Sequence, residues 1–109
     1  MTYNKTTSTL LGIAIGDAVG VPYEFKDHIE MQKNPATDMI GYGTYSQPLG
    51  TWSDDSSLTF CLAESLLNGY DLIDMSKKFI VWRNRAYWTA REELFDIGNT
   101  TYEAISRLE

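Results

Sequence analysis

The sequence is poor in cysteine and histidine. Among its 109 residues there is one cysteine, Cys61, and one histidine, His28. A single cysteine excludes an internal disulfide and is consistent with a reducing compartment. One histidine leaves a single candidate base for Ser-His-Asp or Cys-His catalysis, and its turn-rich surroundings favour a solvent-facing side chain. Cys61 lies on an apolar helical face, so we expect a buried structural thiol rather than a nucleophile.

Long apolar runs and an excess of positive charge are also missing. No uninterrupted apolar stretch is long enough to span a membrane, and the N-terminal apolar patch is broken by Gly16 and Asp17, which makes a poor signal peptide. The sequence has nine basic and fifteen acidic residues, which gives a formal charge of −6. This balance argues against nucleic acid and anionic membranes as partners and is compatible with cation binding. We therefore predict a cytoplasmic protein with no membrane partner.

What the sequence does contain is enough apolar residues for one packed domain. Hydrophobic residues make up 43% and aromatic residues 13%. Apolar periodicity, capping residues and Gly or Pro stop signals predict an all-α fold. The four predicted helices lie near residues 6–19, 55–67, 74–85 and 100–108. A long irregular segment separates the first two.

The first predicted helix has a face with almost no side-chain bulk. Gly12, Gly16 and Gly20 follow one another at intervals of four residues, although each glycine lowers helix stability by about 1 kcal/mol relative to alanine. Such a cost is consistent with a close approach to the helix backbone. A second helix or a ligand would each fit, and helix packing is the commoner case.

The densest chemistry lies just ahead of the second predicted helix. Asp54 and Asp55 are flanked by the hydroxyls of Ser53 and Ser56. Carboxylate and hydroxyl oxygens suit Mg²⁺, Mn²⁺ or Ca²⁺ better than zinc. The same residues would also make a good helix N-terminus, where Ser or Asp caps the first amides and the helix dipole favours negative charge. The stretch alone leaves both interpretations open.

Three separated stretches together resemble the ADP-ribosylglycohydrolase family, which includes dinitrogenase-reductase-activating glycohydrolase. They are residues 12–25 (GIAIGDAVGVPYEF), 50–56 (GTWSDDS) and 95–101 (FDIGNTT). The resemblance implies an all-α fold and a catalytic centre that holds two divalent ions, Mg²⁺ or Mn²⁺. It also implies that Ser53, Asp54 and Asp55 form the first metal-binding cluster, with serine where the family usually has threonine.

The resemblance assigns the remaining site residues as well. Glu24 matches a glutamate that activates water or contacts the scissile bond, and Asp96 matches an aspartate that faces the ribose. Gly98, Asn99 and Thr100 match a loop and helix start that line the ligand. The implied activity is hydrolysis of the N- or O-glycosidic bond at ribose C1″, which removes ADP-ribose from a protein or small-molecule acceptor.

The family domain is considerably longer than this chain, and its second aspartate cluster lies near its C-terminal end. We therefore expect residues 1–109 to form the N-terminal part of a single incomplete domain, inactive when isolated. The expected partners are the missing C-terminal part, a complementary chain or a second copy of this chain, because the helices would expose apolar faces. The alternative is a non-catalytic ligand-binding, interaction or crystallin-like structural derivative of the same family.

Overall fold

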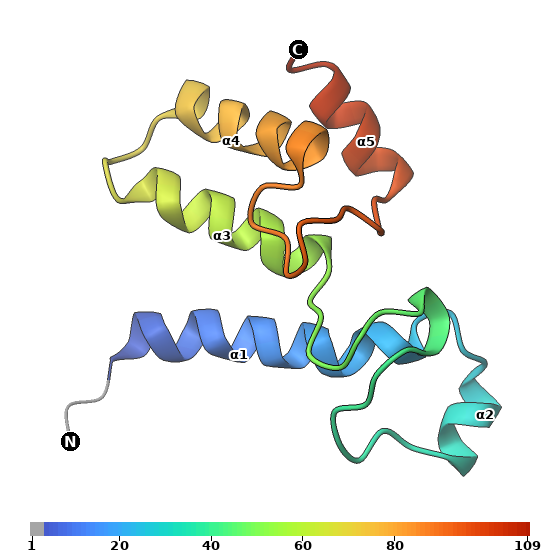
Figure 1. The fold of residues 1–109 in the computed structure, drawn as a ribbon. Coiled ribbons are helices and arrows are strands. Elements are labelled where there is room, and N and C mark those ends of the chain that lie inside the picture. Colours follow the sequence, from blue (N-terminus) through green and yellow to red (C-terminus); the bar gives the residue numbers. More distant parts are fainter. Residues whose placement is uncertain (1–3) are drawn as a thin grey trace. The chain divides into compact units, whose positions relative to one another are not determined.

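The computed structural model describes residues 4–109, and within them it is helical with no β-strand. The only strand-like feature there is an isolated antiparallel bridge between Tyr42 and Gln47. The all-α prediction is therefore confirmed. The elements are α1 (Lys5–Gly20), η1 (Val21–Tyr23), α2 (His28–Lys33), η2 (Gly43–Tyr45), α3 (Asp54–Leu66), α4 (Leu72–Arg85) and α5 (Asn99–Ser106), as Figure 1 shows.

The chain divides into two compact units, one ending at Trp52 and the other spanning Ser53–Glu109. In the first unit, α1 begins after Asn4, whose Oδ1 accepts the Thr7 N–H at 3.1 Å. Asn4 is therefore the N-cap of α1. Pro22 lies just beyond α1, inside the 3₁₀ turn η1, because proline cannot continue the α-helix.

The glycine face of α1 has no close neighbour among the described residues of its own unit. A Cβ added at Gly12, Gly16 or Gly20 would meet no atom of another segment of this unit within 4 Å. The close approach expected from the sequence is therefore not made within the first unit.

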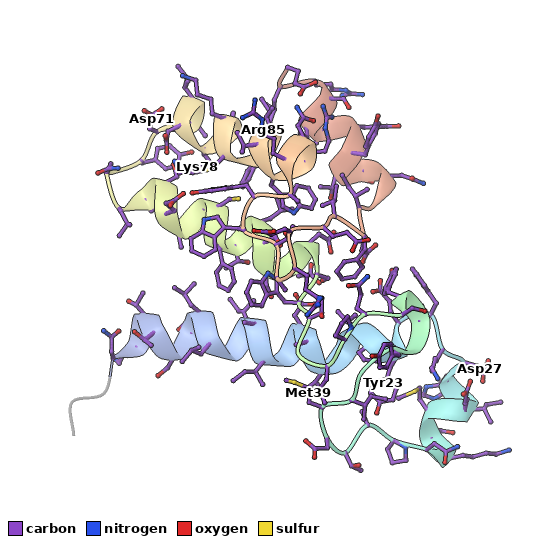
Figure 2. All side chains as sticks on the ribbon, viewed as in Figure 1. Tyr23, Asp27, Met39, Asp71, Lys78 and Arg85 are labelled. Carbon is purple, nitrogen blue, oxygen red and sulfur yellow. The ribbon has the colours of Figure 1, made fainter. Side chains whose placement is uncertain are left out.

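The irregular segment contains a short helix that the sequence analysis did not predict. Asp27 caps α2, because its Oδ1 accepts the N–H groups of Ile29 at 2.8 Å and Glu30 at 3.4 Å. Figure 2 shows Asp27 at this helix start. His28 is the first residue of α2, and its side chain is exposed as expected. Six residues are too few for a helical period to be visible in the sequence.

The second unit is built on a helical hairpin. In Figure 1, α3 and α4 run antiparallel side by side, and α5 packs against α4. Its core is a cluster formed by Cys61 of α3, Trp82 of α4 and Ile105 of α5, all of them buried. Partly buried apolar side chains surround this cluster, namely Leu58, Phe79, Ile80, Leu94 and Ile97.

Polar contacts fix the register of this hairpin. The Ser65 hydroxyl donates to Asp74 Oδ2 at 2.6 Å, which lowers the pKa of Asp74. Lys78 forms ion pairs with Asp74 at 3.3 Å and with Glu64 at 3.8 Å. Helix α4 starts earlier than predicted, at Leu72, since Asp71 is its cap (Figure 2).

Several large apolar side chains remain exposed around the turn between α3 and α4. The exposed fraction is 82% for Leu67, 75% for Tyr70 and 69% for Ile73. Exposed apolar groups close together in sequence favour association. Self-association or pairing with a complementary chain remains a prediction. None of the helices in residues 4–109 is long and apolar enough to cross a membrane.

Candidate functional site

The acidic pair lies at the start of α3, where the helix holds both side chains on a rigid element. Ser53 is the N-cap residue and is buried, but its side chain makes no capping hydrogen bond. Asp54 is half-buried and Asp55 is exposed. The Asp55 N–H donates to Asp54 Oδ1 at 3.1 Å. The residues therefore do not follow the usual capping pattern, in which the cap side chain accepts an amide proton from the first turn.

Electrostatics connect Asp96 to this pair. The pKa of Asp54 is raised from an ordinary value near 3.8 to about 6, first by burial and then by the charges of Asp96 and Asp55, in that order. A hydrogen bond from Ser53 and the Asp55 amide lower it, but by less. Asp96, which lies on a distant segment of the sequence, is therefore near enough for its charge to act on Asp54.

A buried hydroxyl that the sequence analysis missed supports this arrangement. Ser57 Oγ lies 3.1 Å from the Ser53 carbonyl oxygen and 3.0 Å from the Trp88 carbonyl oxygen, so one hydroxyl joins the first turn of α3 to the α4–α5 connection (residues 86–98). That connection carries Asp96. In the sequence, the only sign of this contact is a serine on the inner side of a helix start. Such serines are too common to identify a contact of this kind.

The α4–α5 connection is held in a specific conformation. Ala86, Trp88 and Glu92 all have positive φ values, between 57° and 58°. The Trp88 ring packs on Phe60 of α3, with ring centroids 5.4 Å apart. Non-glycine residues keep this backbone only where the surrounding contacts require it. The connection that carries Asp96 is therefore held against α3 through Trp88.

The predicted ligand-lining residues lie at the start of α5, shortly after Asp96 in the sequence. Gly98 is the N-cap of α5, and Asn99 and Thr100 form its first turn, all three of them exposed. Because glycine has no side chain, it makes no capping hydrogen bond to this helix. Free amides at a helix start can bind an anionic group.

Glu24 belongs to the other unit, where it follows η1 and is half-buried. Its carbonyl oxygen accepts the Thr44 hydroxyl at 2.7 Å, and the same hydroxyl lies 3.2 Å from the Pro22 carbonyl oxygen. The turn from Pro22 to Glu24 is therefore fixed by η2. That Glu24 converges with Asp54 and Asp96 remains a prediction.

Two other groups lie outside this site. Cys61 has no exposed surface, and burial raises the pKa of its thiol to about 11. This agrees with a structural cysteine, because a nucleophile needs an accessible thiolate. A shallow cavity of about 210 Å³ is lined by Lys77, Lys78, Val81 and Tyr87, none of which is a predicted site residue.

The donor set suits a hard divalent cation in kind. Ser53, Asp54 and Asp55 offer two carboxylates and a hydroxyl, and the mutual repulsion that raises the pKa of Asp54 is relieved by positive charge. The number of donors is smaller than such a cation requires, which is about six oxygen ligands. Within residues 4–109, no group of three or more His, Cys, Asp or Glu side chains is arranged to hold a metal ion.

These features define the chain as a helical protein with two adjacent carboxylates at the start of α3, one of which is influenced by the charge of Asp96. Comparison with known proteins gives the family: the ADP-ribosylglycohydrolase model matches residues 1–109, and the chain belongs to that family.

Known proteins with similar sequences include an ADP-ribosylarginine hydrolase Tri1 of Serratia proteamaculans, 35% identical over 95% of this chain, and the corresponding protein of Pseudomonas putida, 32% identical over 94%. The ADP-ribosyl-[dinitrogen reductase] glycohydrolase of Rhodospirillum rubrum is 28% identical over 96% of this chain. The matched regions are 28%, 27% and 35% of these three relatives, so the chain spans about a third of their length.

Proposed function

We propose that this chain supplies the N-terminal part of a divalent-metal-dependent ADP-ribosylarginine hydrolase. Such an enzyme cleaves the N-glycosidic bond between ribose C1″ and the arginine guanidinium and releases ADP-ribose. The observation that carries the proposal is that the charge of Asp96, on the α4–α5 connection, acts on Asp54 beside Asp55 at the start of α3. The arginine acceptor is suggested by the names of the Serratia and Pseudomonas relatives.

In this proposal Ser53, Asp54 and Asp55 would hold the first of two ions, Mg²⁺ or Mn²⁺. The bound ions would supply a site for the ribose hydroxyls and a water molecule of lowered pKa. Because these three residues provide too few oxygen ligands, the other ligands would come from the part of the family domain that lies beyond this chain.

The remaining site residues have distinct roles in the proposal. Glu24 accepts the proton of the attacking water, which is general base catalysis. Asp96 hydrogen-bonds a ribose hydroxyl and so orients C1″. Gly98 has no side chain to cap α5, so the backbone amides of Asn99 and Thr100 are available, and they bind a phosphate oxygen of the ADP moiety.

A second candidate function is that of an interaction module without hydrolase activity. It is favoured by the exposed apolar side chains at the α3–α4 turn, including Leu67 and Tyr70. The two candidates differ in one measurable product, because only the hydrolase releases free ADP-ribose.

The experiment compares the 109-residue chain with a fusion, in which this chain replaces the matched N-terminal 28% of the Serratia relative. With Mg²⁺ or Mn²⁺, the fusion should release ADP-ribose from ADP-ribosylarginine, and the isolated chain should not. Asp54→Asn should abolish release by the fusion. Asp38→Asn is the matched control, since Asp38 is an exposed loop residue whose Oδ1 accepts the adjacent Met39 N–H.

Two results would contradict the proposal. One is hydrolysis by the isolated chain, which would show that the site is not divided. The other is hydrolysis by the fusion that Asp54→Asn leaves intact. A fusion that melts cooperatively but releases no ADP-ribose would favour the interaction module.

A further inference from the structure

Phe25, the residue after Glu24, is presented to solvent in an unusual way. Its side chain is 83% exposed, the largest exposed fraction among the exposed large apolar residues of the described chain. Its backbone is left-handed, with φ of 65°. A bulky residue rarely adopts this conformation, and an apolar ring is usually directed inward instead.

The surrounding contacts impose this exposure. The Thr44 hydroxyl holds the carbonyl oxygen of Glu24 at 2.7 Å, immediately before Phe25. The Phe25 ring forms a T-shaped pair with the Tyr45 ring, with ring centroids 6.3 Å apart and an interplanar angle of 61°. The ring therefore has an aromatic contact with η2, while most of the side chain is left exposed.

The charges along this segment favour a cation. Residues 24–30 carry three carboxylates, Glu24, Asp27 and Glu30, against one ammonium, Lys26. The ammonium is already engaged, because Lys26 forms an ion pair with Glu30 at 3.8 Å. An open aromatic face in a locally acidic segment attracts cations, and the planar guanidinium group stacks on such faces particularly well.

We propose that Phe25 stacks on the guanidinium of the ADP-ribosylated arginine and so determines the preference for this acceptor. The inference rests on the proposed function, since it places the acceptor beside Glu24. Phe25 is a specificity residue in this account and takes no part in bond cleavage. It would bind the half of the substrate that leaves as arginine, and it would not contact the ADP-ribose half.

The main experiment uses the fusion and two ligands that differ only in the acceptor. Phe25→Leu keeps an apolar side chain but removes the aromatic face. It should raise the KM for ADP-ribosylarginine about tenfold, the loss expected for a partly desolvated cation–π contact. The Kd for free ADP-ribose, measured by calorimetry, should stay within about twofold of the parent value.

Two variants complete the test. Phe25→Trp retains an aromatic face and should keep the KM within about twofold of the parent fusion. Tyr70→Leu is the matched control, because Tyr70 is an aromatic residue with an exposed fraction of 75% in the other unit. It should change neither constant.

A second measurement uses the 109-residue chain itself. Millimolar agmatine, which carries a guanidinium, should shift the Phe25 ring resonances in NMR spectra, and butylamine should shift them much less. The Phe25→Leu chain should bind agmatine no better than butylamine.

The inference is overturned if Phe25→Leu leaves the KM unchanged, or if it weakens ADP-ribose binding as much as it raises the KM. The latter result would mean that Phe25 contacts the ADP-ribose half of the substrate or another part of the protein. The proposed function fails separately, if the parent fusion binds ADP-ribosylarginine without hydrolysing it. In that case the Kd for ADP-ribosylarginine replaces the KM in the same comparison.

Discussion

The two compact units of this chain are stabilised by different means. The second unit buries Cys61, Trp82 and Ile105 in one cluster drawn from three helices. The first unit buries no comparable group among its described residues, and its buried apolar residues Ala18, Val21 and Pro22 lie at the end of α1 and in η1. Packing between helices maintains the second unit, and the contact of η2 with η1 and its C-cap, Glu24, maintains the first. The second unit should therefore be most sensitive to the loss of buried side chains, and the first unit to substitutions that disturb the contact between η1 and η2.

The largest expected effect comes from the centre of the second unit. Trp82→Ala removes a fully buried indole and should lower the free energy of unfolding by about 3–5 kcal/mol. Such a loss is comparable to the whole stability of many small domains. Thermal melting followed by circular dichroism should show that the cooperative transition of α3, α4 and α5 is lost.

Trp82→Phe is the control for this prediction. Trp82 Nε1 is buried and has no hydrogen-bond partner within the described residues. Phenylalanine removes that unpaired donor and retains most of the apolar volume, so the loss should be less than half that of Trp82→Ala. Equal losses would contradict this, because they would mean that the apolar volume retained by phenylalanine contributes nothing to stability.

The first unit should be most sensitive at a turn glycine. Gly43 has φ of 67°, and a Cβ at this position would lie 2.7 Å from Pro22 Cα. Gly43→Ala should destabilise the first unit by about 2–3 kcal/mol, from backbone strain and overpacking together. Hydrogen exchange should show lower protection in residues 18–25 and unchanged protection in α3 and α4. Lower protection in both units would show that they are not independent.

A smaller loss is expected from the hydroxyl that joins η2 to η1. Thr44→Val keeps the shape of the side chain but removes its hydrogen bond to the Glu24 carbonyl oxygen. The expected cost is about 1 kcal/mol. The NMR amide signals of Glu24 and Phe25 should shift, while those of Asp54 and Asp55 should not. In the fusion, this variant should lower turnover by displacing Glu24.

The smallest expected effect has the opposite sign. The folded chain binds the Asp54 proton more tightly than the unfolded chain does, because folding raises the pKa of Asp54 to about 6. Ionised Asp54 therefore lowers stability, and this loss develops as the pH rises from about 4 to about 6. Displacement of the pKa from about 4 to about 6 corresponds to about 3 kcal/mol, which solvent screening of this half-buried carboxyl reduces to about 1 kcal/mol.

Asp54→Asn should therefore stabilise the metal-free chain at pH 7 by about 1 kcal/mol. The difference between the two proteins should vanish below pH 4, where Asp54 is protonated in both folded and unfolded states. Urea unfolding at pH 3.5, 5 and 7 measures it, and Asp38→Asn again serves as the control. A constant difference at all three pH values would exclude ionisation as its cause.

The sequence predicted those elements that have a long apolar period. Helices near residues 6–19, 55–67, 74–85 and 100–108 correspond to α1, α3, α4 and α5, with starts displaced by one or two residues. The displacement arises because Asn4 and Asp71 are the actual caps, and nearby Thr, Ser and Asp residues are equally good candidates in the sequence. Helix α2 was missed, although Asp27 and Glu30 have the spacing of a helix start.

The site was predictable only in part, and for a physical reason. The residues Ser53, Asp54 and Asp55 are adjacent, so their grouping is local. Their relation to Asp96 depends on the left-handed backbone of the α4–α5 connection, which no periodicity reports. The resemblance to the ADP-ribosylglycohydrolase family was what pointed to Asp96. The exposure of Phe25 could not be predicted either, because a phenylalanine after a turn is normally assigned to the core.

The left-handed backbone at Ala86, Trp88 and Glu92 also has a consequence for the order of folding. The α3–α4 hairpin is formed by contacts between neighbouring segments, whose closure is fast. The connection can adopt its strained backbone only after Trp88 has a packed hairpin to contact. We expect the transition state to contain the hairpin and not the connection, so substitutions at Trp88 should mainly accelerate unfolding. Asp96 would then reach Asp54 late in folding, when the helices are already in place.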